Sequence, residues 1–270
     1  MKLVVLGSGA AEAIPDPFCR CRVCEIARLK GGPEMRGRSA ALINDDLLID
    51  LGPDIVSAAN RFNMYLGNLR MVLITHNHSD HWLPSNLHWR EPGFAATPVS
   101  PLTVYGPEDA LCDIQPYLER ASDLSAVPVC AGQRWAAGAY QVTAVPATHG
   151  DGKLEALLYV VDDGTHRLFY ATDTSTPGRE AWNILAPLGP LDAILLDMTS
   201  GLQDGGSGHH GFEKFLRTRE RMIKENLVGE ETRLIAHHFS HNGGLTHAEL
   251  VARLAPLGVS VSYDGMALAL

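Results

Sequence analysis

Basic residues are few and long apolar runs are absent from this sequence. The 270 residues include 22 Lys and Arg against 31 Asp and Glu, which gives a formal net charge of −9. Such a chain lacks the basic surface that follows a nucleic-acid backbone, so we expect no nucleic-acid partner. No stretch approaches the ~18 apolar residues of a membrane-spanning helix, and the run LVVL after Lys2 is too short for the core of a signal peptide. We therefore expect a cytoplasmic protein that does not bind membranes.

Cysteine is also scarce, and its placement does not suit a disulfide-rich secreted protein. Of five cysteines, three gather in the stretch FCRCRVCE and two stand alone. A disulfide within the cluster would close a very small, strained loop, whereas zinc accepts three thiolates and a histidine in tetrahedral geometry. We predict a structural Zn site made by Cys19, Cys21 and Cys24, with His241 as the candidate fourth ligand. This ion would clip a loop at about residues 15–38.

Short β-rich segments bounded by turn residues make up much of the chain. The expected strands are residues 2–7, 40–44, 47–52, 71–76, 102–106, 140–147, 156–163, 166–173, 192–197, 233–238 and 260–265. Helical periodicity appears at residues 54–63, 107–120, 178–188, 212–227 and 246–257. Because strands outnumber helices and several come as consecutive hairpins, a simple parallel βαβ protein fits poorly. We expect an α/β (α+β) fold of one domain over residues 1–270, with two mixed sheets packed together and helices outside.

The heptapeptide THNHSDH, residues 75–81, directly follows the apolar run MVLI. In an extended segment His76, His78 and Asp80 point to one side, and His81 joins them only if the chain turns. Imidazole and carboxylate groups bind divalent metal ions, and burying several of them without compensation is costly. The spacing predicts two half-sites, His76 with His78 for one ion and Asp80 with His81 for a neighbouring ion.

Three further candidate ligands follow predicted strands elsewhere in the chain: His149, Asp173 and His238. A carboxylate such as Asp173 can bridge two ions, so the seven residues suffice for a binuclear centre with exchangeable water positions. His237 directly precedes His238 and faces the opposite way if the strand continues. Mixed nitrogen and oxygen ligands suit Mn and Zn about equally.

This pattern of residues resembles the metallo-β-lactamase superfamily. The matching motifs are THNHSDH, the TH pair at 148–149, the TD pair at 172–173 and a late histidine at a strand end. The resemblance implies an αββα sandwich with both metal ions at one edge, between the sheets. It also implies that Asp50 orients metal ligands by hydrogen bonding, and it favours His238 over His237 as the ligand. The alternative for Asp50 is that it only caps the turn LGPD.

Four motifs together resemble one subgroup, the PhnP-type phosphodiesterases of the carbon-phosphorus lyase pathway. They are C-x-C-x-x-C near the N-terminus, H-x-H-x-D-H, S-H after the last ligand strand, and YDGM at 263–266. The resemblance implies action on cyclic ribose phosphates, a Cys3His zinc clip and a homodimer. It also implies that His210 contacts the phosphate or assists the leaving group, although its neighbour His209 could take that role. Pro84 and the long segment 88–101 depart from the family pattern near the expected substrate pocket.

The sequence thus predicts a binuclear-metal hydrolase, a phosphodiesterase that acts on a small cyclic or nucleotide-like phosphodiester. A water that bridges the ions would attack phosphorus while the ions neutralise charge on the phosphoryl oxygens. The catalytic candidates are Asp80, as a ligand of the second ion, and His210, as general acid or phosphate donor. The alternatives are a lactonase or thioesterase of the same fold and a non-catalytic binding protein like the pyrroloquinoline quinone accessory proteins.

Overall fold

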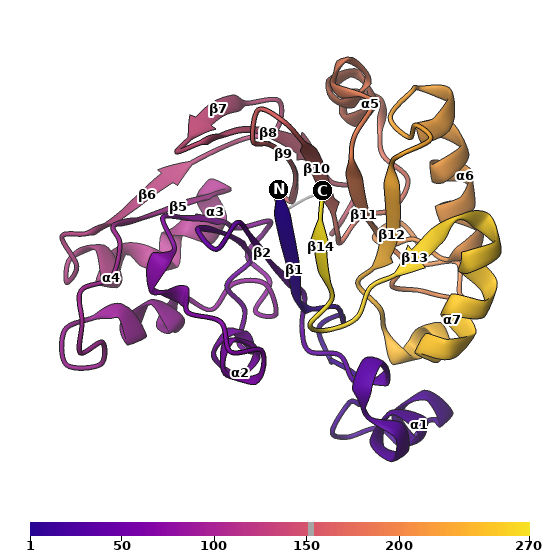
Figure 1. The fold of residues 1–270 in the computed structure, drawn as a ribbon, viewed down its shortest axis with the longest axis horizontal. Helices are drawn as coiled ribbons and strands as arrows, with labels where there is room; N and C mark the ends of the chain where they lie inside the picture. Colours follow the sequence, from indigo (N-terminus) through magenta and orange to yellow (C-terminus); the bar gives the residue numbers. More distant parts are fainter. Residues whose placement is uncertain (151–153) are drawn as a thin grey trace.

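Two seven-stranded β-sheets pack together in the computed structural model, which describes residues 1–150 and 154–270. Helices lie on the outer side of each sheet, so the layers run helix, sheet, sheet, helix (Figure 1). This arrangement confirms the predicted sandwich of two mixed sheets flanked by helices. Within the described ranges, no helix is both long and apolar enough to cross a membrane.

The first sheet has the strand order β14-β1-β2-β3-β4-β5-β6. Its pairs are antiparallel from β14 to β3 and parallel from β3 to β6. The strands are β1 (Lys2–Gly7), β2 (Ala40–Ile43), β3 (Leu47–Ile49), β4 (Met71–Leu73), β5 (Leu102–Gly106), β6 (Leu124–Pro128) and β14 (Ala267–Ala269). Because β3 and β4 are parallel neighbours, the segments that follow them begin at the same edge of the sheet.

The second sheet has the order β13-β12-β11-β10-β9-β8-β7 and is built in the same way. Its pairs are parallel from β13 to β10 and antiparallel from β10 to β7. The strands are β7 (Arg134–Ala137), β8 (Tyr140–Pro146), β9 (Leu157–Asp162), β10 (Arg167–Ala171), β11 (Ala193–Asp197), β12 (Arg233–His237) and β13 (Val259–Val261). The ends of β10, β11 and β12 therefore also share one edge.

Most helices are short, and the longest, α6 (Phe212–Lys224), lies on the outer side of the second sheet (Figure 1). The α-helices are α1 (Arg22–Lys30), α2 (Ile55–Arg61), α3 (Glu108–Leu111), α4 (Gln115–Leu118), α5 (Arg179–Leu185), α6 (Phe212–Lys224) and α7 (His247–Leu254). The 3-10 helices are η1 (Gly32–Glu34), η2 (Leu66–Asn68), η3 (Pro84–Arg90), η4 (Cys112–Ile114), η5 (Ala186–Leu188), η6 (His241–Gly243) and η7 (Ala255–Leu257). Helix α7 begins with a capping box in which Thr246 and Glu249 satisfy each other's backbone amides.

Three apolar clusters fill the spaces between the layers. Ile49 and Tyr159 belong to the cluster between the two sheets. Phe215 of α6 packs in the cluster outside the second sheet, and Leu87 of η3 packs in the cluster outside the first. Strands such as β11, which is buried along its whole length, lie between two of these clusters. This position explains why such segments read as continuous apolar runs rather than as alternating patterns.

The structure differs from the expected elements in three places. The helix expected at 107–120 breaks into α3, η4 and α4, because Pro116 cannot donate a backbone hydrogen bond within a continuous helix. Strands β6, β7 and β14 were not expected, since they are short or largely exposed and carry little apolar signal. Helix α1 lies in a segment expected to be a loop, and it buries only the short face of Val23, Cys24 and Ala27.

Candidate metal centre

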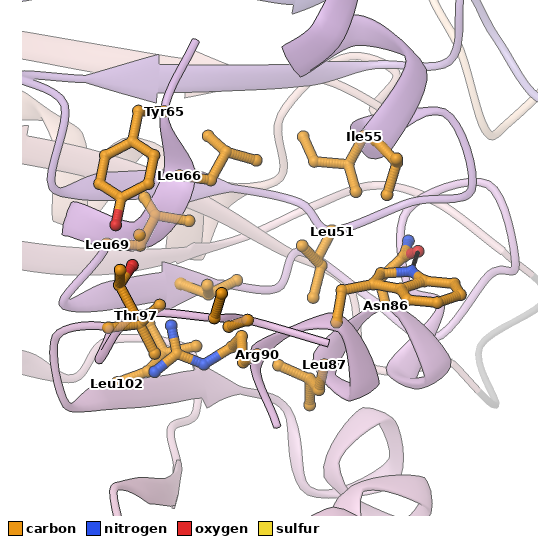
Figure 2. Close-up of a pocket in the computed structure, with 17 residues that line it drawn as sticks. Leu51, Ile55, Tyr65, Leu66, Leu69, Asn86, Leu87, Arg90, Thr97 and Leu102 are labelled. Atoms are coloured by element: carbon orange, nitrogen blue, oxygen red, sulfur yellow. Dashed lines mark hydrogen bonds between the residues drawn. The ribbon is translucent and has the colours of Figure 1, made fainter. Parts of the chain in front are cut away.

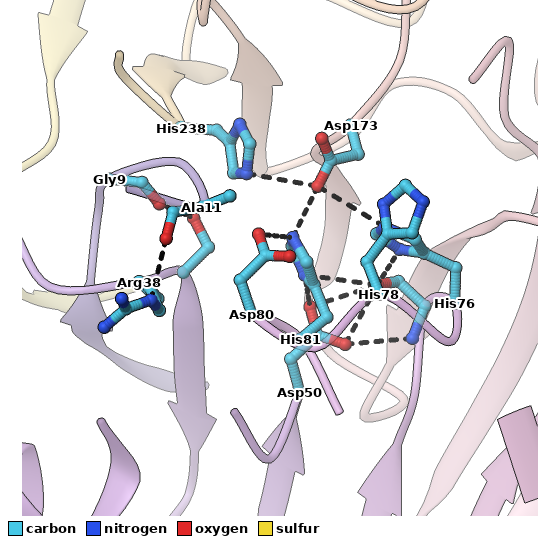
Figure 3. A network of polar contacts seen from close by, with 12 residues as sticks. Gly9, Ala11, Arg38, Asp50, His76, His78, Asp80, His81, Asp173 and His238 are labelled. Carbon is cyan, nitrogen blue, oxygen red and sulfur yellow. Dashed lines mark hydrogen bonds and ion pairs between the residues drawn. The ribbon is translucent and has the colours of Figure 1, made fainter. Parts of the chain in front are cut away.

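Four chain segments meet at one edge of the sandwich, each of them directly after a strand. Asp50 follows β3, the heptapeptide follows β4, Asp173 follows β10, and His238 follows β12. Asp50, Asp173 and His238 have positive φ angles of 64°, 48° and 61°. Such backbone angles are uncommon for residues with a side chain and tend to gather at functional sites. Figure 3 shows the side chains of these segments converging.

The first cluster of candidate ligands consists of His76, His78 and His149. Their ring nitrogens all lie within 4.8 Å of one another. Nδ1 of His78 is 2.9 Å from Nε2 of His76 and 3.3 Å from Nε2 of His149. Burial lowers the pKa of His76 well below its usual value, and the neighbouring imidazoles lower it further. The His76 ring is therefore neutral and has a lone pair available for a metal ion.

The second cluster consists of Asp80, His81, Asp173 and His238, again within 4.8 Å of one another. Oδ2 of Asp173 lies 2.5 Å from Nε2 of His81 and 3.1 Å from Nε2 of His238. Oδ2 of Asp80 lies 3.1 Å from Nε2 of His81. Asp173 also faces the first cluster, with Oδ1 3.8 Å from Nε2 of His149. The structure thus brings together all seven residues that the sequence grouped, with Asp173 between the two clusters.

These residues fit divalent metal ions. Oδ2 of Asp173 and the Nε2 atoms of His81 and His238 are buried and lie close together, but none of them makes a hydrogen bond of good geometry with any described residue. Burial would lower the pKa of His81, but Asp173 and Asp50 outweigh burial and raise it well above its usual value. Positive charge is therefore favoured at this point, and a divalent ion supplies more of it than a proton does. The mixture of imidazole and carboxylate donors is suited to Zn or Mn.

Asp50 holds His81 from the side opposite to the candidate ion. Its Oδ2 lies 2.7 Å from Nδ1 of His81, and both residues are fully buried. The backbone amide and the hydroxyl of Thr75 both donate to Asp50 Oδ1, at 2.9 Å each. Asp50 therefore fixes the orientation of the imidazole, which directs Nε2 toward the second cluster.

An equivalent support for His238 comes from residues that the sequence analysis did not identify. Nδ1 of His238 lies 2.7 Å from Oγ1 of Thr199, and that hydroxyl donates to Oδ2 of Asp197 at 2.8 Å. Asp197 and Thr199 form the stretch DMT at the end of β11 and are buried. The one signal that the sequence offered was an aspartate, Asp197, at the end of an apolar strand.

The structure places His209, rather than His210, beside the candidate ligands. The side chain of His210 is fully buried, and its Nε2 lies 2.9 Å from Oγ1 of Thr218 in α6. His209 is partly exposed, and its Nδ1 lies 3.1 Å from Oδ2 of Asp197 and 3.5 Å from Oδ1 of Asp173. Burial opposes protonation of His209, but Asp197 and Asp173 raise its pKa to about 9. A fully buried side chain does not reach a substrate, so the structure does not support the role predicted for His210.

The cysteine cluster forms a separate candidate site near the end of β12. Cys19, Cys21, Cys24 and His241 offer ligand atoms within 4.8 Å of one another. Sγ of Cys21 lies 3.5 Å from Nδ1 of His241. Burial opposes ionisation of Cys21, but hydrogen bonds from Cys24 and His241 lower the pKa of its thiol to about 7. Three thiols and one imidazole are the donor set of a structural zinc site.

Comparisons with known proteins agree with this architecture. A family model described as "Beta-lactamase superfamily domain" matches residues 46–239. A crystal structure of a diphosphatase from the PhnP family has 22% sequence identity and a TM-score of 0.77, over 100% of this chain and 97% of that chain. Zn(2+)-bound PqqB from Methylobacterium extorquens has 19% identity and a TM-score of 0.73, over 100% of both chains. At these identities the likeness to the solved structures shows the fold.

A curated relative is similar to only part of the chain. An octanoyltransferase of Porphyromonas gingivalis is 37% identical over 87 residues, which is 30% of this chain and 16% of that protein. The family match, in contrast, covers more than half of the chain and includes all seven candidate ligands of the two clusters at the sandwich edge. The chain therefore belongs to the beta-lactamase superfamily, with the sandwich of its metallo-β-lactamase members, and this membership supports a metal-dependent hydrolase.

Proposed function

We propose that the protein is a binuclear-metal phosphodiesterase that acts on a small cyclic or nucleotide-like phosphodiester. The observation that carries the proposal is the pair of ligand clusters with Asp173 between them. The PhnP-family structure of the same fold is named a diphosphatase, which places phosphate chemistry among proteins of this architecture. The net charge of −9 gives no overall attraction for an anionic substrate, so in this proposal the metal ions would supply the local positive charge.

The seven ligand residues divide between two ions in this proposal. His76, His78 and His149 would hold one ion, and Asp80, His81 and His238 would hold the other, with Asp173 between them. Bound divalent ions of this kind lower the pKa of water and neutralise charge on phosphoryl oxygens. Asp50 and Thr199 keep the imidazoles of the second ion in one orientation, so that both ions would keep a fixed spacing.

His209 is the residue that we assign to the substrate phosphate and the leaving group. Its ring lies 5.0 Å from the ring of His149 and 6.0 Å from the ring of His238, centroid to centroid. Asp197 accepts a hydrogen bond from Nδ1, which orients the ring and stabilises its protonated form. A protonated imidazole at this place can donate to a phosphoryl oxygen and give its proton to the departing alkoxide.

The first test is release of p-nitrophenol from bis(p-nitrophenyl) phosphate by protein stripped of metal and reloaded with Mn or Zn. We expect turnover that depends on the added metal. Replacing His209 with Gln is expected to lower kcat by about 10²-fold or more on a 2′,3′-cyclic nucleotide, whose alkoxide leaving group needs a proton, and by less on bis(p-nitrophenyl) phosphate. The matched control is His210→Gln, because this neighbouring buried imidazole should affect stability and leave kcat within a few-fold.

Three results would contradict this proposal or the role that it gives His209. Fully metal-loaded protein without phosphodiester turnover, together with hydrolysis of lactones or thioesters, would assign the site to acyl hydrolysis. Metal-loaded protein that hydrolyses neither class would favour a binding role. A drop in kcat for His210→Gln that equals the drop for His209→Gln would contradict the role of His209 alone.

A further inference from the structure

An apolar cavity of about 350 Å³ lies on the outer side of the first sheet, apart from the metal centre. Figure 2 shows Leu51 and Ile55 on one side of it, and Leu66, Leu69 and Leu102 on another. Its remaining wall comes from η3 and from the segment 95–99, which belong to the region where this sequence departs from the family pattern. The volume lies in the range of small-molecule binding sites in proteins.

The rim of the cavity exposes large aromatic side chains to solvent. Tyr65 is 60% exposed and Trp89 is 52% exposed, and both line the cavity. Phe94 is 55% exposed, and its ring centroid lies 5.5 Å from that of Trp89. An isolated exposed aromatic residue is ordinary, but two on the wall of an apolar cavity, with a third packed against one of them, indicate a place where an apolar molecule binds.

Arg90 is the single charged residue among the 17 residues that line the cavity. Its Nη2 donates to Ser100 O at 2.7 Å and to Asp123 Oδ2 at 3.2 Å. Within residues 1–150 and 154–270, Nε and Nη1 have no hydrogen-bond partner. Burial lowers the pKa of the Arg90 guanidinium even though Asp123 opposes the change. The guanidinium is thus a partly desolvated cation with two nitrogens free to bind an anion.

We propose that this cavity binds a medium-chain carboxylate, with the alkyl chain among the leucines and the carboxylate on Arg90. The apolar lining suits an apolar chain, and the single cation, which Asp123 contacts only through Nη2, suits one anionic group at its end. The site does not depend on the proposed function, because none of its lining residues is a candidate metal ligand. A longer chain buries more methylene groups, so affinity should rise with chain length until the cavity is full.

The test is calorimetric titration of the metal-loaded, full-length protein with octanoate, butyrate and 1-octanol. We expect one octanoate per chain, with butyrate and 1-octanol each binding at least about tenfold more weakly, because one lacks most of the alkyl chain and the other lacks the charge. Ala96→Trp, which fills the cavity mouth from an exposed position, should weaken octanoate binding at least about tenfold. The same substitution at Ala139, an exposed residue outside the cavity, should leave binding unchanged.

Arg90→Met tests the anionic contact, with Arg70→Met as its matched control, because Arg70 is exposed and does not line the cavity. We expect Arg90→Met to reduce the difference between octanoate and 1-octanol to less than about threefold, and Arg90→Lys to restore part of it. The metal content and the thermal midpoint of each variant verify that it is folded.

Four outcomes would overturn the proposal. Octanoate that does not bind, or that binds Ala96→Trp as well as it binds the wild type, excludes the cavity as the site. Competition by inorganic phosphate would instead place the carboxylate at the metal centre. If octanoate does not bind, and sedimentation shows a dimer that Ala96→Trp dissociates, the occupant of the cavity is a second copy of the chain.

Discussion

The two candidate metal-binding regions differ in what holds their ligands. At the sandwich edge, His76, His81 and His238 are at most 1% exposed; His76 and His238 lie close to strand ends, and His81 lies in the turn after β4, where Asp50 at the end of β3 holds it. In the cysteine cluster, Cys19 and Cys21 are only half-buried, and they lie on a loop that precedes α1. Strand ends position ligands before any ion binds, whereas a loop depends on the ion to fix its shape. We therefore expect the edge site to have its final geometry before metal binds, and the cysteine site to become ordered only when its metal binds.

The hydrogen bonds around the ligands also differ between the two regions, and they support the same expectation. Asp50 and Thr75 support His81, and Asp197 and Thr199 support His238. In the cysteine cluster, Nε2 of His241 lies 3.4 Å from Asp16 and 3.7 Å from Glu12, which are ion-pair contacts rather than well-aligned hydrogen bonds.

The largest effect should come from removing the carboxylate between the two ligand clusters. Asp173→Asn removes the negative charge and one metal-binding oxygen, so we expect at least about a 10³-fold loss of metal-dependent turnover, equal to several kcal/mol of barrier. Metal content by atomic emission should fall at the same time. Asp173 belongs to no strand and to no apolar cluster, so the far-ultraviolet circular dichroism of the variant should not change. A loss of folded structure would contradict an edge site that is formed before the metal binds.

A smaller effect should follow from removing the support of one ligand. Asp50→Asn takes the acceptor charge from His81 Nδ1, and we expect about 10- to 100-fold weaker metal binding at the edge site. Equilibrium dialysis against a metal buffer measures the change. Asp45→Asn, at an exposed turn, is the matched control and should have no effect. Unchanged metal affinity in Asp50→Asn would favour the alternative in which Asp50 only caps a turn.

Removing the metal site of the cysteine cluster should destabilise the segment 15–38 and have little effect on turnover. Cys24→Ser replaces the most buried thiol of the cluster, so we expect the loss of one zinc per chain and faster hydrogen exchange at residues 15–38. Turnover should stay within about tenfold, since the edge ligands are held by strands. Cys112→Ser, at an isolated exposed cysteine, is the control. A complete loss of turnover in Cys24→Ser would show that the two regions are not independent.

The smallest expected effect concerns Glu12, which lies near Nε2 of His241. Glu12→Gln keeps the shape and removes the charge, so zinc binding at the cysteine site should weaken by up to about tenfold. Competition with a chromogenic chelator measures the affinity. Any change at the edge site in this variant would contradict the separation of the two regions.

The sequence predicted the ligands that local spacing or a strand end reveals. His76, His78, Asp80 and His81 lie within one heptapeptide, and His149, Asp173 and His238 each follow an apolar segment. His209 was not separable from His210, because a loop has no periodicity that decides which of two adjacent residues faces inward. Asp197 and Thr199 were missed because their role depends on the pairing of β11 with β10 and β12, which only the fold provides.

Two mixed sheets were expected, but several of their edge strands were not. β6, β7 and β14 are short or exposed, so their sequences lack the apolar content that indicates a strand. Their assignment depends on a neighbouring strand that offers hydrogen bonds. The cavity beside η3 could not be predicted from the sequence either. It depends on the distance between the first sheet and the segments that cover it, a 3-10 helix and the connection that follows.

Two adjacent histidines at the end of β12 make strand register a source of error during folding. Nδ1 of His237 lies 2.8 Å from Oγ of the fully buried Ser262, while His238 faces Asp173. A slip of one residue would exchange the two imidazoles, and a metal ion could then capture the wrong one. In the native register Ser262 contacts Nδ1 of His237, and Ser39 and Tyr170 lie near its Nε2. These contacts hold His237 on the side away from Asp173, so that His238 is the imidazole offered to a metal ion.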